Sequence, residues 1–481
     1  MGMAPDRFRE QFHQIQQAMA DVPLAAGPAG APQFLYEKGY VLARESEAEE
    51  VAELIRDRFR EEPGREEQVE RVGRRYDPGG VARIRVGRGE DRDPWSDRDV
   101  TDALEAVRGR ERETGRRMVT RNHVVSIAVN CCPGDEPVPV APCRPPNPAV
   151  DAGAPGGGTV RVLVVDTGLV TDYDTHSWIG HVGGRGKREG EVDTEGILKQ
   201  YVGHGTFITG LIGAVAPHAD ITVHNTLENA GAILEKDLGD RLLEDLAALG
   251  RWPDIISLSA GTPTTCVETL LGLERFMERL AAEPRTLLVA AAGNNGSDER
   301  FWPAAYAGQP EYADVVVSVG ALRKDGSARA CFSNHGPWVK AYAPGERLVS
   351  AFTAMDGTPV RYDYQHSTYD HCRYGSTYDC TCQFPPHRGE LTENMAASPT
   401  AVRDRVEFDG LAQWSGTSFA TPLVVGMIVN HMMANPGVGS RQAARDLLAG
   451  SPAATVQGRS TRVLFPPTWT PSAVQEAPPL S

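Results

Sequence analysis

Three apolar runs of β-forming residues, each ending in a turn of small residues, constrain the fold of this chain more than any other feature. They read TVRVLVVDTG from Thr159, DIISLSAG from Asp254 and TLLVAAAGNNG from Thr286. Continuous apolar runs of this kind are typical of parallel strands that are buried on both faces. Open sheets of such strands place their functional sites at the carboxyl ends of the strands. The sequence therefore predicts an α/β domain with a site at these turns.

An aspartate, a histidine and a serine stand in glycine-framed turns beside apolar segments. Asp166 ends the first strand run, His204 lies in Gly-His-Gly-Thr before an apolar helical segment, and Ser418 lies in Ser-Gly-Thr-Ser-Phe-Ala before another. A serine hydroxyl needs a base to become a nucleophile, and a neutral histidine suits that role. The histidine in turn needs an acceptor on its other nitrogen, which a buried aspartate supplies. The three residue types together predict an acyl-transfer site.

Two further stretches fit the same chemistry. Asn294 follows the third strand run, where a side-chain amide can donate to the oxyanion of a tetrahedral intermediate. Ser418 opens a helix, whose first N–H groups and dipole favour the same negative charge. Ser259, Ala260 and Gly261 end the second run, and such small residues let a substrate backbone lie alongside.

In this order, the motifs Asp166-Thr167-Gly168, His204-Gly205-Thr206 and Gly-Thr-Ser-Phe-Ala-Thr-Pro around Ser418 resemble those of subtilisin-like serine peptidases, the subtilases. The resemblance covers about residues 159–450. It implies a mostly parallel central sheet flanked by helices, and hydrolysis of polypeptides by Asp166, His204 and Ser418. It also implies an oxyanion role for Asn294, pairing of substrate with Ser259, Ala260 and Gly261, and a chemistry that needs no cofactor. Calcium stabilises many relatives, but the sequence places no calcium site.

Phe301 is the candidate determinant of specificity. It stands two residues before Pro303, and in relatives that position forms the base of the pocket for the side chain that precedes the scissile bond. A phenyl ring there predicts a shallow, apolar pocket that favours small or medium side chains. The segment Phe-Ile-Thr after His204-Gly205-Thr206 departs from the family pattern, as does the long separation between Asn294 and Ser418.

Residues 33–130 predict a small α+β domain with the order β-α-β-β-α-β, a ferredoxin-like pattern. The strands are expected at 33–43, 68–76, 81–86 and 124–129, with helices that begin near Ser46 and Ser96 and carry capping-box spacings to Glu49 and Asp99. The position of this domain resembles the inhibitory propeptide of subtilases, which makes it a candidate intramolecular inhibitor. An unrelated appended domain is the alternative.

The other segments are shorter. Residues 1–32 combine a small-residue linker with an amphipathic helix, because Phe8, Phe12, Ile15 and Met19 fall on one helical face. Residues 131–158 are a linker rich in proline and glycine, the expected place for any processing. The catalytic domain is expected at 159–465, with an insertion at 353–412, and residues 466–481 form a tail.

The insertion contains closely spaced thiols and imidazoles, among them Cys372, Cys380, Cys382 and His387. Such groups can bind zinc, although their spacing matches no standard finger. Free thiols or a disulfide are the favoured alternative, and the insertion is expected to border the cleft.

The net charge of −15 argues against nucleic acid as the main partner, and no apolar run predicts a membrane span. Charged residues in the first 22 positions argue against an export signal, so the sequence predicts a cytoplasmic protein, or a secreted one if its start is misassigned. Two other functions stay open: an esterase or amidase with the same three residues, and a catalytically silent binding module.

Overall fold

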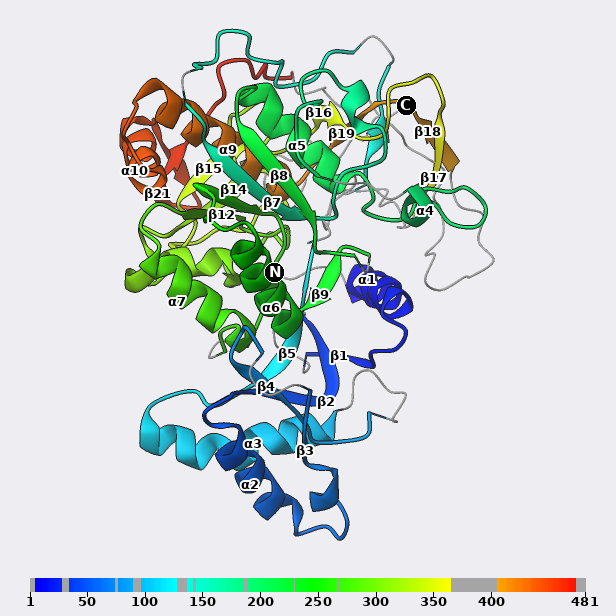
Figure 1. The fold of residues 1–481 in the computed structure, drawn as a ribbon, viewed down its shortest axis with the longest axis vertical. Coiled ribbons are helices and arrows are strands. Elements are labelled where there is room, and N and C mark those ends of the chain that lie inside the picture. Colours follow the sequence, from blue (N-terminus) through cyan, green and yellow to red (C-terminus); the bar gives the residue numbers. More distant parts are fainter. Residues whose placement is uncertain are drawn as a thin grey trace.

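The computed structural model describes residues 5–27, 34–73, 77–89, 97–127, 136–141, 144–156, 158–184, 188–228, 230–265, 268–364 and 405–472. It contains a smaller N-terminal domain and a larger body, which lie one above the other in Figure 1. Both parts match the predicted fold class.

The N-terminal domain is an antiparallel sheet covered on one side by two helices. Its strands and helices are β1 (Leu24–Ala26), β2 (Leu35–Arg44), α2 (Ala48–Phe59), β3 (Glu70–Val72), β4 (Val81–Arg85), α3 (Arg98–Thr114) and β5 (Val119–Ser126). The strand order β3-β4-β2-β5 is that of a ferredoxin-like sheet, with β1 paired to the N-terminal part of β2. Helix α1 (Pro5–Ala18) precedes this domain, and the amphipathic helix expected there is confirmed.

Both helices of this domain begin within two residues of the predicted positions, at Ala48 and Arg98, but the predicted cap of the first is wrong. The N-cap of α2 is Glu47 and makes no side-chain cap, so the predicted capping box at Ser46 does not form. Helix α3 is capped by Asp97, whose side chain accepts from the backbone N–H of Val100, and Ser96 lies outside the described residues.

The body is built on an eight-stranded sheet of order β20-β21-β15-β14-β12-β10-β7-β8. All of its neighbouring pairs are parallel except β20 with β21. The strands are β7 (Arg161–Asp166), β8 (Asp220–Asn225), β10 (Ile255–Leu258), β12 (Leu287–Ala291), β14 (Val316–Leu322), β15 (Ala341–Pro344), β20 (Ala453–Val456) and β21 (Arg459–Val463). The first strand of this sheet along the sequence is β7. The next one, β8, lies on one side of it, and the later strands extend the sheet on the other side. A crevice is therefore expected between the carboxyl ends of β7 and β10, where the strand order reverses.

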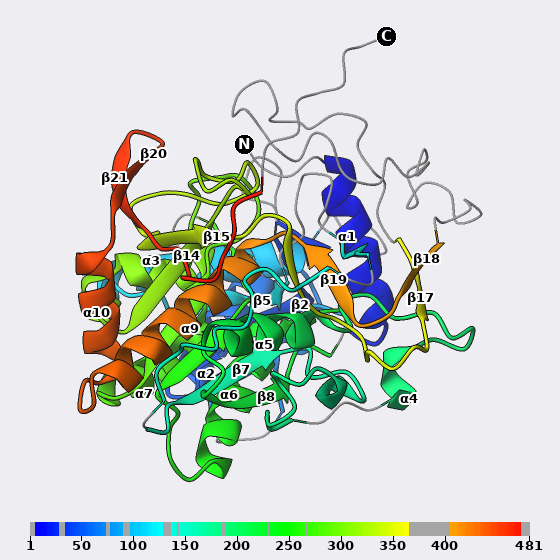
Figure 2. The ribbon, with the colours of Figure 1, turned by 90° about the horizontal axis from the view of Figure 1, so that it is seen from above.

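Helices cover both faces of this sheet. Figure 1 shows α5 (His204–Val215) and α9 (Thr417–Ala434) on one side, and α6 (Glu235–Ala248) and α7 (Glu274–Ala282) on the side that faces the N-terminal domain. Every residue of α5 is buried, which explains its continuous apolar sequence. Helix α9 is long and apolar enough to cross a membrane by composition, but 78% of it is buried as the central helix of the body. Helix α10 (Ser440–Gly450) packs beside it (Figure 2).

Short strands complete the body around the site. They are β6 (Val138–Pro139), β9 (Ala232–Leu234), β11 (Thr262–Pro263), β13 (Phe301–Trp302), β16 (Leu348–Ala351), β17 (Val360–Asp363), β18 (Arg405–Phe408) and β19 (Leu411–Trp414), with the short helix α4 (Arg188–Glu191) nearby. Strand β6 pairs with β19, and Glu136 accepts a hydrogen bond from the Tyr362 hydroxyl at 2.6 Å. Part of the expected linker 131–158 thus lies against the body.

Candidate active site

Asp166 and His204 meet at the carboxyl end of β7. Asp166 ends that strand, His204 begins α5, and the distance from His204 Nδ1 to Asp166 Oδ1 is 2.8 Å. Both side chains are almost completely buried. Thr167 also holds the carboxylate, because its backbone N–H donates to the same oxygen, Asp166 Oδ1, at 2.8 Å. The pair is therefore held in one orientation before any substrate arrives.

Aromatic rings enclose the imidazole of His204. Trp414 meets it edge to face with 5.3 Å between ring centroids, and Phe419 packs at 5.2 Å. Tyr201 lies farther away, at 6.3 Å. The rings exclude water from the histidine and limit its rotation. The sequence did not predict the role of these residues, since an isolated aromatic residue carries no periodic signal.

Ser418 lies in the first turn of α9, directly before Phe419. Its hydroxyl donates to the backbone oxygen of Ser259 at 3.3 Å, and the Ser259 hydroxyl donates to the backbone oxygen of Ser418 at 3.0 Å. The end of β10 and the start of α9 are thus bound to each other. The structure brings Ser418 to the same edge of the sheet as Asp166 and His204.

Asn294 follows β12 and is anchored to the same helix start. Its Oδ1 accepts hydrogen bonds from the backbone N–H of Thr417 at 2.9 Å and from the Thr417 hydroxyl at 2.8 Å. Thr417 Oγ1 in turn accepts from the N–H of Gly293 at 3.1 Å. Because the oxygen faces Thr417, the NH₂ group of Asn294 faces the opposite way. Thr417 was also missed as a positioning residue, although it belongs to the serine motif.

The end of β5 from the N-terminal domain lies between two strands of the body. On one edge, Val124, Val125 and Ser126 pair antiparallel with β9. On the same edge, Ile127 N–H donates at 2.9 Å to the oxygen of Gly231, the residue before β9. On the other edge, Ser126 exchanges backbone hydrogen bonds with Gly261, at 3.0 and 2.9 Å. A segment of this chain thus pairs with Gly261, the last residue of the predicted substrate-binding stretch Ser259, Ala260 and Gly261. A three-residue strand such as β9 is too short to be recognised from sequence.

Phe301 lies against two glycines of the candidate site, Gly261 and Gly293. A methyl group added to Gly261 would lie 2.3 Å from Phe301 Cε1, and one added to Gly293 would lie 2.8 Å from its Cγ. Phe301 itself is 3% exposed. The ring therefore fills the space beside Gly261 and next to Asn294, which leaves little depth there.

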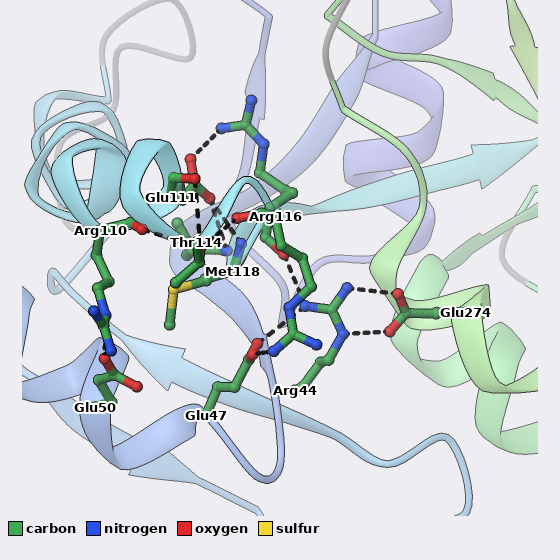
Figure 3. A network of polar contacts seen from close by, with 11 residues as sticks. Arg44, Glu47, Glu50, Arg110, Glu111, Thr114, Arg116, Met118 and Glu274 are labelled. Atoms are coloured by element: carbon green, nitrogen blue, oxygen red, sulfur yellow. Dashed lines mark hydrogen bonds and ion pairs between the residues drawn. The ribbon is translucent and has the colours of Figure 1, made fainter.

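Ion pairs join the N-terminal domain to α6, α7 and the loops between them. Figure 3 shows Arg44 of β2 making a two-pronged contact with Glu274, with both distances at 2.5 Å. Arg121 of β5 donates to Glu268 at 2.7 Å. In a third pair the positive charge lies on the body, because Lys236 of α6 contacts Asp77 of the N-terminal domain at 2.7 Å. The interface thus carries complementary charges of both signs.

His123 of β5 is a fully buried ionisable group of this interface. It lies 3.5 Å from Glu235 and 3.3 Å from Glu268, and all three side chains are buried. These are ion-pair contacts whose angles fall short of hydrogen bonds. Burial lowers the pKa of His123, but the two carboxylates outweigh it and raise the pKa to about 9. Burial raises the pKa of Glu268, yet His123 and Arg121 bring it down to about 2. Burial raises the pKa of Glu235.

The described residues include no group of three or more His, Cys, Asp or Glu side chains gathered for a metal ion. The candidate zinc residues Cys372, Cys380, Cys382 and His387 lie outside the described residues.

Comparisons with known proteins agree with this architecture. The model of the subtilase (peptidase S8) family matches residues 157–461. The chain is 32% identical over 210 residues to an intracellular serine protease of Paenibacillus polymyxa. This alignment covers 40% of this chain and 59% of that protein. The chain is also 29% identical over 211 residues to the major intracellular serine protease of Bacillus subtilis (strain 168). This second alignment covers 40% of this chain and 60% of that protein. The chain thus spans at most about three fifths of these relatives.

Among solved structures, fervidolysin from Fervidobacterium pennivorans, a keratinolytic enzyme related to subtilisin, matches with a TM-score of 0.53. The match covers 94% of this chain and 63% of that chain. The identity is 16%, so this likeness concerns the fold. Because the family model extends over most of the body and the chain's own architecture matches it, the chain belongs to the subtilase family.

Proposed function

We propose that this chain is a serine endopeptidase in which Ser418 is the nucleophile, His204 the general base and Asp166 the residue that orients the histidine. The contact of 2.8 Å between His204 Nδ1 and Asp166 Oδ1 carries this proposal. Because Nδ1 faces the carboxylate, Nε2 is the nitrogen available to the hydroxyl of a substrate-bound Ser418. The hydroxyl, which now donates to Ser259, turns toward Nε2 when substrate binds.

The reaction follows from these positions. Ser418 Oγ bonds to the carbonyl carbon while its proton passes to His204 Nε2. The tetrahedral intermediate then collapses, the bond from carbon to nitrogen breaks, and His204 gives the proton to the leaving amine. A water molecule repeats the sequence on the acyl-enzyme and releases the carboxylic acid. Asp166 keeps the histidine in the correct tautomer and stabilises its positive form.

The NH₂ group of Asn294 and the backbone N–H of Ser418 are the proposed donors to the oxyanion. The anchoring of Asn294 Oδ1 by Thr417 supports this role, since it fixes the amide plane before the charge develops. The start of α9 adds a favourable dipole at the same point. All of these groups belong to the chain, and the proposed chemistry uses no cofactor.

A polypeptide is the proposed substrate. The pairing of residues 124–127 between β9 and Gly261 supports this choice over a small ester, because extended backbone is what such a slot recognises. The same pairing supports a restraining role for the N-terminal domain, since its last strand occupies the slot that a substrate would use. We also propose Phe301 as the group that limits the neighbouring pocket to small and medium side chains. The names of two relatives support an intracellular location, which stays a prediction.

A fluorophosphonate probe tests the catalytic assignment. It forms a bond from phosphorus to an activated serine oxygen and releases fluoride, and the labelled peptide is identified by mass spectrometry. We expect the label on Ser418, both in the full chain and, at a higher rate, in a chain cut within residues 128–135. Ser418→Ala should abolish labelling, and Ser415→Ala in the same loop should retain it. Equal labelling of the Ser418→Ala chain, or none after the cut, would refute the assignment.

A further inference from the structure

Helix α1 packs where its position in the sequence does not predict it. The helix directly precedes the N-terminal domain, yet its buried side chains do not join the core of that domain. They join the core of the body, together with the cleft-bound residues Val124, Val125 and Ile127 and with β9. The buried apolar side chains described in the helix and in the turn after it are Phe8, Phe12, Ile15 and Met19. Figure 1 shows α1 beside β9, at the level where the two parts of the molecule meet.

We propose that α1 is a second restraining element, which docks over the outer face of residues 124–127 and holds this segment in the cleft. The proposal rests on the proposed function, because it concerns the control of the same site. Backbone pairing with β9 and Gly261 holds the two edges of the segment, and an edge contact alone leaves its outer face to solvent. The apolar face of α1 covers that side.

A buried polar contact fixes the register of the helix on the segment. Gln11 is 8% exposed, although it lies on the apolar side of α1. Its Nε2 donates to Ser126 Oγ at 3.3 Å and to the backbone oxygen of Ile127 at 3.5 Å. A buried amide is costly without partners, so this glutamine favours the docked position only when residues 126 and 127 lie in the cleft.

The fit between helix and cleft is close. A small, partly open space, lined by residues that include Phe8, Gln11, Val124, Gly261 and Phe301, has a volume of about 30 Å³, which admits about two water molecules. Phe301, the proposed pocket residue, therefore lies near the helix as well as near the cleft-bound segment. A polypeptide substrate cannot enter this side of the cleft while α1 and residues 124–127 are in place.

A tether returns the helix to this position. Gln16 closes the turn after α1, since its Nε2 donates to the Val22 oxygen at 2.9 Å and its Oε1 accepts from Leu24 N–H at 2.9 Å. Leu24 begins β1, which pairs with β2 of the N-terminal domain. A helix of 14 residues is marginal in isolation, so α1 is expected to fold where it docks and to unfold when it is released. These are the properties of a reversible latch.

Hydrogen exchange of residues 124–127 tests the latch in the full chain. We use the Ser418→Ala background, so that hydrolysis plays no part in the readout. Phe12→Asp places a charge in the buried face, and we expect exchange of these amides to rise by about 10- to 100-fold, the range for losing one buried aromatic contact. Gln17→Asp adds the same charge on the exposed face of the same helix and should change exchange less than about twofold.

A second variant and a peptide keep the test decisive. Gln11→Leu keeps the volume but removes the donors, and should raise exchange at 126 and 127 by about tenfold. A peptide of residues 1–22 added to the Phe12→Asp chain should restore protection. Unchanged exchange of 124–127 in both variants, with the amides of α9 still protected as proof of folding, would overturn the proposal.

Peptide turnover of the same variants in the Ser418 chain separates this proposal from the proposed function. We expect Phe12→Asp to raise turnover by about tenfold and Gln17→Asp to leave it unchanged. If exchange rises but no form hydrolyses peptides, the latch stands and the endopeptidase assignment falls. If the chain hydrolyses peptides but neither exchange nor turnover responds to Phe12→Asp, the assignment stands and the latch falls.

Discussion

Raising the pH should release the N-terminal domain from the body, and His123 should account for most of the effect. In an undocked domain His123 is exposed to water, with an ordinary pKa of 6.5, whereas in the interface it is about 9. A group whose pKa is raised by docking contributes fully below 6.5 and loses that contribution as the pH rises through 9. The difference corresponds to about 3 kcal/mol of docking free energy.

The two glutamates, Glu235 and Glu268, also make the docking free energy depend on pH. Burial raises the pKa of Glu235, so its ionisation at rising pH also weakens docking. Glu268, with a pKa of about 2, contributes above its ordinary value of 4.5 and loses that contribution as the pH falls through 2. Docking should therefore be strongest between the two ordinary values, 4.5 and 6.5.

Hydrogen exchange in β5 measures this release in the Ser418→Ala chain. The ratio of protection between His123 and His123→Gln chains cancels the intrinsic effect of pH on exchange. We expect a ratio of about 100 near pH 6 that falls to about 1 near pH 9.5, because neutral histidine and glutamine then interact alike. His224→Gln on β8, whose histidine pairs with Asp245 on the body, is the matched control, with a ratio near 1 throughout. A ratio for His123→Gln that does not change with pH would refute the reasoning.

Three further predictions concern single contacts. Asn294→Ala should lower kcat by about 10²–10³ with little change in KM, measured by steady-state peptide hydrolysis, and a change confined to KM would argue against an oxyanion role. Phe301→Gly should deepen the pocket and raise kcat/KM for aromatic over alanine substrates in a peptide library, by a graded factor since such contacts are worth about 1–3 kcal/mol. An unmoved ratio would show that Phe301 does not line the pocket. Arg44→Met should weaken docking by about 1 kcal/mol in denaturant unfolding, and high salt should shrink that loss if the contact with Glu274 is electrostatic.

The sequence was most informative where the backbone itself carries the signal. The apolar runs that end at Asp166, Ser259 and Asn294 form β7, β10 and β12, because strands buried on both faces must be apolar throughout. Their common parallel direction then brings the turns to one edge. The stripe of Phe8, Phe12 and Ile15 likewise predicted α1 from helical spacing alone.

The contacts between distant segments were not predictable from sequence. The stripe on α1 shows that a face is buried but not what covers it, and its partner at 124–127 lies more than a hundred residues away. The pairing of Ser126 with Gly261 depends on backbone groups that every residue has. The ion pairs of His123 and Arg121 depend on two glutamates from another part of the chain.

Peptide turnover before and after removal of the N-terminal domain tests the central claim most directly. A recognition site for an unrelated protease, placed within residues 128–135, allows the chain to be cut after folding, and the cut N-terminal part is then separated from the body. Turnover of an internally quenched peptide should rise by at least about tenfold on removal, and should be absent from the Ser418→Ala chain in both forms. Equal turnover before and after removal, or turnover that survives Ser418→Ala, would contradict the account of a serine endopeptidase restrained by its own N-terminal domain.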